Sequence, residues 1–292
     1  MRLTDATLES AVAFTIGERV NDVGTITAID SHAHVFRRDL PLASVRRHTP
    51  NYDALLADYL TLLDAYAVSH AVLVQPSFLG SDNHFLLAAL RAWPQRLRGV
   101  VVVEPTASER ELQTLAEGGV CGIRLNLVGL SVPDFSCANW QALFARVRAL
   151  GWHVELHCES RDLAHAAQPV LDAACKLVID HFGRPDPARS SADPGWDWLL
   201  RASGSGHVWV KLAAGYRSWP DQGGAAARDA AQALLRAFGA ERLVWGSDWP
   251  NTQYRESVDY ASAHAALADW VPDVAARRRI LVDTPAQLFQ FV

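Results

Sequence analysis

Two histidines separated by one residue, His32 and His34, end an apolar stretch near the start of the chain. Side chains alternate along an extended strand, so we expect both imidazoles to point to the same side. Two neutral imidazoles on one side suit a divalent ion such as zinc. An H-x-H pair alone is a weak signal, because a single buried histidine is more often a hydrogen-bonded core residue. A metal site at this pair would therefore require further polar residues beside it.

Three more polar side chains stand at the ends of apolar runs that have the length of strands. They are His157, His181 and Asp248. In a barrel of parallel strands the carboxyl ends of the strands meet at one rim, where catalytic residues collect. We therefore expect four histidines and one aspartate to share a site.

The residue types in this set suggest hydrolytic chemistry. His32, His34 and His157 would supply three nitrogen ligands to a catalytic metal ion, with zinc the expected metal, and Asp248 would supply a carboxylate. A water bound to such an ion, with its pKa lowered toward about 7, is a nucleophile at neutral pH. His181 would polarise a carbonyl oxygen or position the water. Asp248 would also serve as the general base.

The elements that must position these residues alternate regularly along the chain. Eight apolar runs of strand length are separated by amphipathic stretches, which is typical of βα units and a parallel sheet. The expected strands are 25–31, 70–75, 99–104, 122–126, 153–157, 177–181, 208–212 and 243–247, and the expected helices are 52–65, 83–93, 109–116, 140–150, 162–174, 196–202, 225–238, 256–270 and 272–281. Eight units favour an α/β fold of the (β/α)8 TIM-barrel type. An open doubly wound sheet is the alternative, but the glycine fingerprint of a dinucleotide site is missing after the first strand.

Length and composition fit one large domain. The chain has 292 residues, of which 50% are hydrophobic and 20% charged, enough for a large buried core. We assign residues 25–292 to a single barrel domain and residues 1–24 to an N-terminal arm.

Charge and cysteine content exclude some functions and favour others. The formal net charge of −5, without a run of like charge, argues against non-specific nucleic-acid binding. The four cysteines are neither closely paired nor dense, which fits a reduced, cytoplasmic setting. Neither a signal peptide nor a membrane span is expected. A homo-oligomer is compatible with the sequence, which gives no readable interface.

Five motifs give the chain a family resemblance. SHAHVF (31–36), GIRLN (122–126), DHFGRPD (180–186), VWVKL (208–212) and GSDWP (246–250) resemble the amidohydrolase superfamily, in particular its amidohydrolase-2 branch of metal-dependent barrel hydrolases. The similarity covers nearly the whole chain from residue 25. The segment LVQPSFLGSDN (73–83) resembles one subgroup, the 2-pyrone-4,6-dicarboxylate lactonases. The resemblance implies a hydrolase that opens the ring of a small carboxylated lactone by attack of water.

The same resemblance implies roles for individual residues. Ser77, Arg124, Arg217 and Asn251 would hold the carboxylates and the ring of the lactone, and His32, His34, His181 and Asp248 would surround its scissile carbonyl. A planar guanidinium suits a carboxylate, and a protein of net negative charge needs such local positive charge to hold a small anionic substrate. The alternative is that these arginines pair with neighbouring acidic residues.

Two departures from the subgroup leave questions open. The subgroup works without a metal and has a non-ligand residue at the position of His157, so His157 favours a metal-competent site while metal-free chemistry stays an alternative. The loop 126–130 also lacks a further arginine that the subgroup uses for its second carboxylate. The substrate could therefore be another lactone, such as a sugar-acid lactone or a muconolactone.

Other readings of the same residues remain. A decarboxylase or hydratase of an unsaturated carboxylic acid could use the same barrel and metal, and a binding protein without turnover is the third alternative. Lys211, in the expected strand 208–212, would either take part in acid–base chemistry or pair with a carboxylate such as Glu104 or Glu155.

Overall fold

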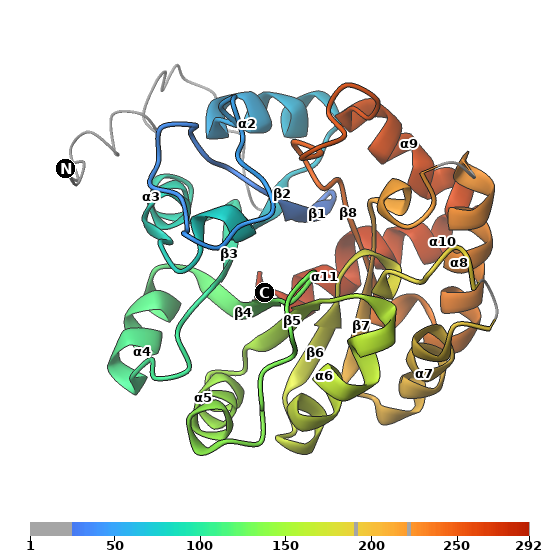
Figure 1. Ribbon diagram of the computed structural model, residues 1–292. Coiled ribbons are helices and arrows are strands. Elements are labelled where there is room, and N and C mark those ends of the chain that lie inside the picture. Colours follow the sequence, from blue (N-terminus) through green and yellow to red (C-terminus); the bar gives the residue numbers. More distant parts are fainter. Residues whose placement is uncertain (1–24, 190–191, 221–222, 292) are drawn as a thin grey trace.

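Eight parallel strands form one sheet in which each strand pairs with the next along the chain (Figure 1). The computed structural model describes residues 25–189, 192–220 and 223–291. The strands are β1 (Ile29–Ala33), β2 (His70–Val74), β3 (Leu97–Val101), β4 (Val120–Asn126), β5 (His153–His157), β6 (Lys176–Ile179), β7 (Val208–Ala213) and β8 (Leu243–Gly246). Strands covered on both faces need apolar residues throughout, which explains the near-continuous apolar runs in the sequence.

The last strand returns to the first and closes the barrel. The backbone N–H of Asp248 donates to the carbonyl of His32 at 2.8 Å, and that of His34 donates to the carbonyl of Trp249 at 2.8 Å. At Gly246 the strands approach so closely that an added Cβ would lie 2.5 Å from the Cβ of His32. The predicted TIM barrel is confirmed, and the open-sheet alternative is wrong.

Helices follow the strands and cover the outside of the barrel (Figure 1). They are α2 (Leu56–Ala65), α3 (His84–Ala92), α4 (Glu109–Glu117), α5 (Ala138–Ala149), α6 (Ser160–Asp172), α7 (Pro194–Ala202), α8 (Gly223–Phe238), α9 (Tyr260–Trp270), α10 (Val274–Arg278) and α11 (Thr284–Leu288). Several begin at caps that the sequence encodes. Asp193 accepts hydrogen bonds from the first turn of α7, and Asp259 forms a capping box at the start of α9. A π-helical turn over Arg279–Asp283 joins α10 to α11.

The end of the barrel opposite the site is filled by apolar side chains. Leu288 and Phe289 of the C-terminal segment pack with Ile29, Val100 and Val244 from inside the barrel. Within the described residues, this packing fills the amino-terminal end of the barrel.

The predicted N-terminal arm, residues 1–24, lies outside the described residues. Within the ranges that the structure describes, no helix is both long and apolar enough to cross a membrane.

Candidate active site

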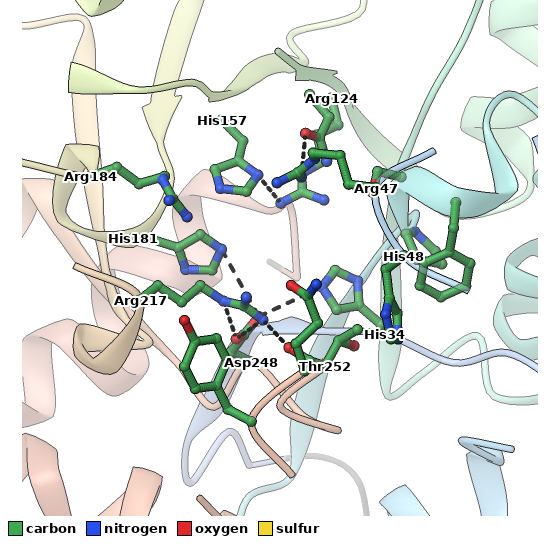
Figure 2. Close-up of a pocket in the computed structure, with 16 residues that line it drawn as sticks. His34, Arg47, His48, Arg124, His157, His181, Arg184, Arg217, Asp248 and Thr252 are labelled. Atoms are coloured by element: carbon green, nitrogen blue, oxygen red, sulfur yellow. Dashed lines mark hydrogen bonds and ion pairs between the residues drawn. The ribbon is translucent and has the colours of Figure 1, made fainter. Parts of the chain in front are cut away.

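A pocket opens at the carboxyl ends of the strands, where the sequence places its polar residues (Figure 2). Its lining comes from strand ends and from the loops that follow them. The lining residues are His34, Arg47, His48, Pro76, Ser77, Phe78, Arg124, Asn126, His157, His181, Arg184, Arg217, Asp248, Thr252, Gln253 and Tyr254. Asp248 and the predicted histidines His34, His157 and His181 therefore share one cavity, and His32 lies fully buried beside it.

Asp248 has two oxygens with different surroundings. Its Oδ2 accepts from Arg217 Nε at 2.8 Å and from the hydroxyl of Tyr216 at 2.5 Å. Its Oδ1 has no hydrogen-bond partner among the described residues. Burial alone would raise the pKa of Asp248, but Arg217 and the nearby imidazoles hold that pKa well below its ordinary value. Asp248 is therefore ionised at neutral pH, with one oxygen left to accept a proton.

Three imidazole nitrogens face this free oxygen. The Nε2 atoms of His32 and His34 each lie 3.7 Å from Asp248 Oδ1, and that of His181 lies at 4.0 Å. The Nδ1 of His34 lies 2.7 Å from the carbonyl of Val74, and the Nδ1 of His181 lies 3.3 Å from the carbonyl of Ala213. Since a carbonyl only accepts, both rings carry a proton on Nδ1 and turn Nε2 toward Asp248. Burial lowers the pKa of His181 to about 3, which keeps its ring neutral.

His32 rests on a buried layer of charged side chains. Its Nδ1 lies 3.0 Å from Lys211 Nζ and 3.3 Å from Asp180 Oδ1. Lys211 also donates to the carboxylate of Glu155. Both acids are fully buried, and Lys211 is too. Of the alternatives that the sequence left open for Lys211, the structure shows pairing with Glu155.

The Nδ1 atoms of His34 and His181 face backbone carbonyls, whereas the Nδ1 of His157 accepts a hydrogen bond. Arg124 Nη2 lies 3.4 Å from that nitrogen, and a guanidinium only donates. The neutral ring of His157 therefore carries its proton on Nε2, which is buried and has no partner among the described residues. Burial, and then the charge of Arg124, lowers the pKa of His157 well below its ordinary value, so the ring stays neutral.

The arrangement fits a divalent metal ion. One ligand atom from each of His32, His181 and Asp248 lies within 4.8 Å of the others, and His34 Nε2 is 3.7 Å from Asp248. His32 Nε2 and Asp248 Oδ1 are buried polar atoms that have no partner in the described part of the chain, as expected of atoms that would bind the same ion. Nitrogen and carboxylate ligands of this kind suit zinc. His181, rather than His157, joins the compact group, so the predicted ligand set of His32, His34, His157 and Asp248 stays a prediction.

The four residues that the resemblance assigned to the substrate lie in different environments. Ser77 and Arg217 line the pocket. Arg124 also reaches it, but its Nε and Nη2 donate to Asp180 Oδ2 at 3.1 and 2.8 Å. Asn251 is buried outside the lining, and its amide donates to the hydroxyl of Tyr216 and the carbonyl of Ser247. The predicted substrate contacts of these residues stay predictions, although internal pairing dominates for Arg124.

Sequence reasoning missed several residues of the lining, among them Arg47, His48 and Arg184. Arg184 belongs to the DHFGRPD motif, which was a usable signal. Arg47 and His48 lie in the long loop between β1 and α2, where no periodicity points to a site.

Comparison with known proteins agrees with this geometry. The family model described as Amidohydrolase matches residues 29–291. The chain is 32% identical over 273 residues to a 4-sulfomuconolactone hydrolase of Rhizobium radiobacter, covering 90% of this chain and 89% of that protein. It is 30% identical over 278 residues to a 2-pyrone-4,6-dicarboxylate hydrolase of Comamonas testosteroni, covering 90% of each.

A solved structure is similar over the same extent. A crystal structure from Pseudomonas putida, named as a candidate 2-pyrone-4,6-dicarboxylic acid hydrolase, is 48% identical with a TM-score of 0.86 and covers 91% of this chain and 98% of that one. The family match, the barrel and the histidine–aspartate rim lead to one conclusion: this chain belongs to the amidohydrolase family.

Proposed function

We propose that this chain opens the ring of a small anionic lactone by attack of water on the ring ester. One observation carries the proposal: the ionised carboxylate of Asp248 keeps an unpaired oxygen in the pocket, and Arg217 holds the other oxygen. A carboxylate placed in this way can take a proton from an attacking water. The relatives named for lactone hydrolysis support the same reaction.

The hydrolysis balances with the groups present. The oxygen of a water molecule forms a bond to the lactone carbonyl carbon, and Asp248 Oδ1 accepts the proton that the water loses. The bond between that carbon and the ring oxygen then breaks, and Asp248 returns the proton to the leaving oxygen. The product is a hydroxy acid or its keto form, and the carboxylate is free again.

A divalent ion would be held by His32, His181 and Asp248, with His34 beside them. When bound, it would supply the positive charge that polarises the lactone carbonyl and lowers the pKa of the attacking water. The tautomers favour such an ion. His34 and His181 each donate from Nδ1 to a backbone carbonyl, and burial keeps the ring of His181 neutral, so His181 Nε2 is better placed to bind a cation than to donate to an oxyanion. We propose zinc because the donors are nitrogen and carboxylate oxygen.

Charge in the pocket supports an anionic substrate. Among the described residues, four arginines line the cavity, whereas Asp248 is the one carboxylate in the lining. The chain as a whole has a formal net charge of −5, so this positive charge is local. A local excess of positive charge in a pocket is stabilised when a carboxylate or a sulfonate enters.

A substrate panel tests the proposal. The purified protein is assayed with matched pairs of lactones, each pair sharing a ring and differing in one carboxylate or sulfonate, and ring opening is followed by ultraviolet absorbance and by a mass gain of one water. We expect turnover of the anionic members and much slower turnover of the neutral ones. Hydrolysis of no lactone would contradict the proposal. Release of carbon dioxide from an unsaturated acid would support the decarboxylase alternative instead.

A further inference from the structure

The four pocket arginines fall into two kinds. Arg124 forms an ion pair with Asp180, and Arg217 forms one with Asp248, each closer than 3 Å. Arg47 and Arg184 form no ion pair with a carboxylate among the described residues. The Arg47 guanidinium donates to Asn126 Oδ1 at 3.3 Å, and the Arg184 Nε is buried without a partner. Two of the four arginines therefore keep donors for a ligand.

The nearby carboxylate of Glu159 forms no ion pair with Arg47 or Arg184 among the described residues. Glu159 acts on both electrostatically, but its carboxylate accepts from the backbone N–H of Gly129 at 3.2 and 3.3 Å. Burial, and then repulsion between the arginines, lowers the pKa values of Arg47 and Arg184. Arg47 is exposed at the rim of the pocket and Arg184 is half-buried in it. Two neighbouring cations that repel each other and lack a carboxylate partner are an arrangement that a bound anion would stabilise.

His157 supplies a third donor on the same wall of the pocket. Arg124 donates to its Nδ1, so its proton lies on Nε2, which is buried and has no partner among the residues that the structure describes. Figure 2 shows its ring between Arg184 and Arg47, on the far side of the pocket from Asp248. An anion on this wall would be held away from the negative charge of the catalytic carboxylate.

We propose that Arg47, Arg184 and His157 form the subsite that binds the anionic substituent of the substrate, a carboxylate or a sulfonate, and that they set the enzyme's preference for charged lactones. This inference rests on the proposed function and deepens it. It assigns the substituent to residues other than Arg124 and Arg217, whose guanidinium groups are paired with Asp180 and Asp248. The ring of the lactone then spans from this wall to Asp248.

Charge-removing variants test the subsite. Arg184→Gln and Arg47→Gln each keep a long polar side chain and lose the positive charge, and Arg189→Gln, an exposed arginine outside the pocket, is the matched control. For an anionic lactone we expect KM to rise at least about tenfold in each pocket variant, with a smaller change in kcat. The ratio of kcat/KM between the anionic and the neutral lactone of a pair should fall in both. A ratio unchanged in both pocket variants would overturn the proposal.

Binding without turnover separates the subsite from the reaction. Calorimetric titration with pyridine-2,4-dicarboxylate, a planar ring that cannot be hydrolysed, should give a dissociation constant that is weaker by about tenfold in the pocket variants than in Arg189→Gln. Arg184→Lys, which keeps the charge, should recover part of this binding. If no lactone is hydrolysed but the titration shows this pattern, the subsite stands and the reaction is wrong. If lactones are hydrolysed and the dissociation constant is the same in every variant, the subsite is wrong. Thermal melting of each variant confirms that it is folded.

Discussion

Arg217 donates to a single oxygen of Asp248, with Nε at 2.8 Å and Nη2 at 2.7 Å from Oδ2. The hydroxyl of Tyr216 donates to the same oxygen. These contacts keep the carboxylate ionised and turn its other oxygen toward the imidazoles of His32, His34 and His181. The neighbours of Asp248 thus set both its charge and the orientation of its second oxygen.

Asp248→Asn should abolish most of the activity. An amide has nearly the volume of the carboxylate but cannot accept a proton from water, so we expect kcat to fall by about 100- to 10,000-fold. Asp229→Asn, an exposed change on α8, is the control and should retain normal activity. The measurement is the rate of lactone ring opening together with a thermal melt. A folded Asp248→Asn protein with near-normal kcat would contradict the role of the base.

Zinc affinity distinguishes the ligand set that includes His181 from the set that includes His157. After removal of metal with a chelator, titration with zinc should show affinity reduced by at least about tenfold in His181→Asn, because His181 belongs to the compact group with His32 and Asp248. His157→Asn should change the affinity much less, since its Nε2 carries a proton. Calorimetry and elemental analysis measure both. Loss of zinc in the His157 variant alone would instead support the set expected from the sequence.

The fold was predictable because its determinants are local. Eight apolar runs of strand length and the helical segments between them define a barrel, and the ends of those runs identify the histidines and Asp248 as rim residues. The observed strand bounds differ from the expected ones by a few residues; β1, for example, begins at Ile29 rather than Thr25. The strand also includes the polar residues Ser31 and His32, which are buried in the closed barrel.

The partners of the site residues were not predictable in the same way. The register of β4 and β5 places Arg124 beside Glu155, and both point into the barrel, where Asp180 reaches them from the end of β6. Such pairing depends on three-dimensional register, which has no periodic signature in the sequence. The tautomer of His157 depends in turn on Arg124.

The buried ion pair of Lys211 and Glu155 should be important for stability. Burial raises the pKa of Glu155, and the nearby cations Lys211 and Arg124 oppose that change. Lys211→Met removes a cation and leaves buried negative charge, so we expect a loss of about 3–5 kcal/mol in the free energy of unfolding. The double variant Lys211→Met with Glu155→Gln should regain much of it, because no unpaired charge remains at that position.

Denaturant unfolding measures all of these variants. Lys176→Met is the matched control, because Lys176 is partly exposed and donates to a backbone carbonyl, that of Gly151. We expect it to cost about 1 kcal/mol or less. A double variant as unstable as Lys211→Met alone would show that the two side chains are not coupled.

Acid should destabilise the protein partly through His70, at the start of β2. Burial, followed by the charges of Arg96 and Arg98, lowers the pKa of His70 from its ordinary 6.5 to about 4. The folded state therefore favours the neutral ring. The resulting stability is complete above pH 6.5 and is lost as the pH falls from 6.5 toward 4, where the unfolded chain binds a proton more readily. His70→Gln should remove this dependence, so its unfolding free energy should fall less between pH 7.5 and pH 5, by about 2 kcal/mol. His165→Gln, an exposed change on α6, should follow the unmodified protein. Equal losses in all three proteins, measured by denaturant unfolding at the two pH values, would show that His70 does not cause the acid sensitivity.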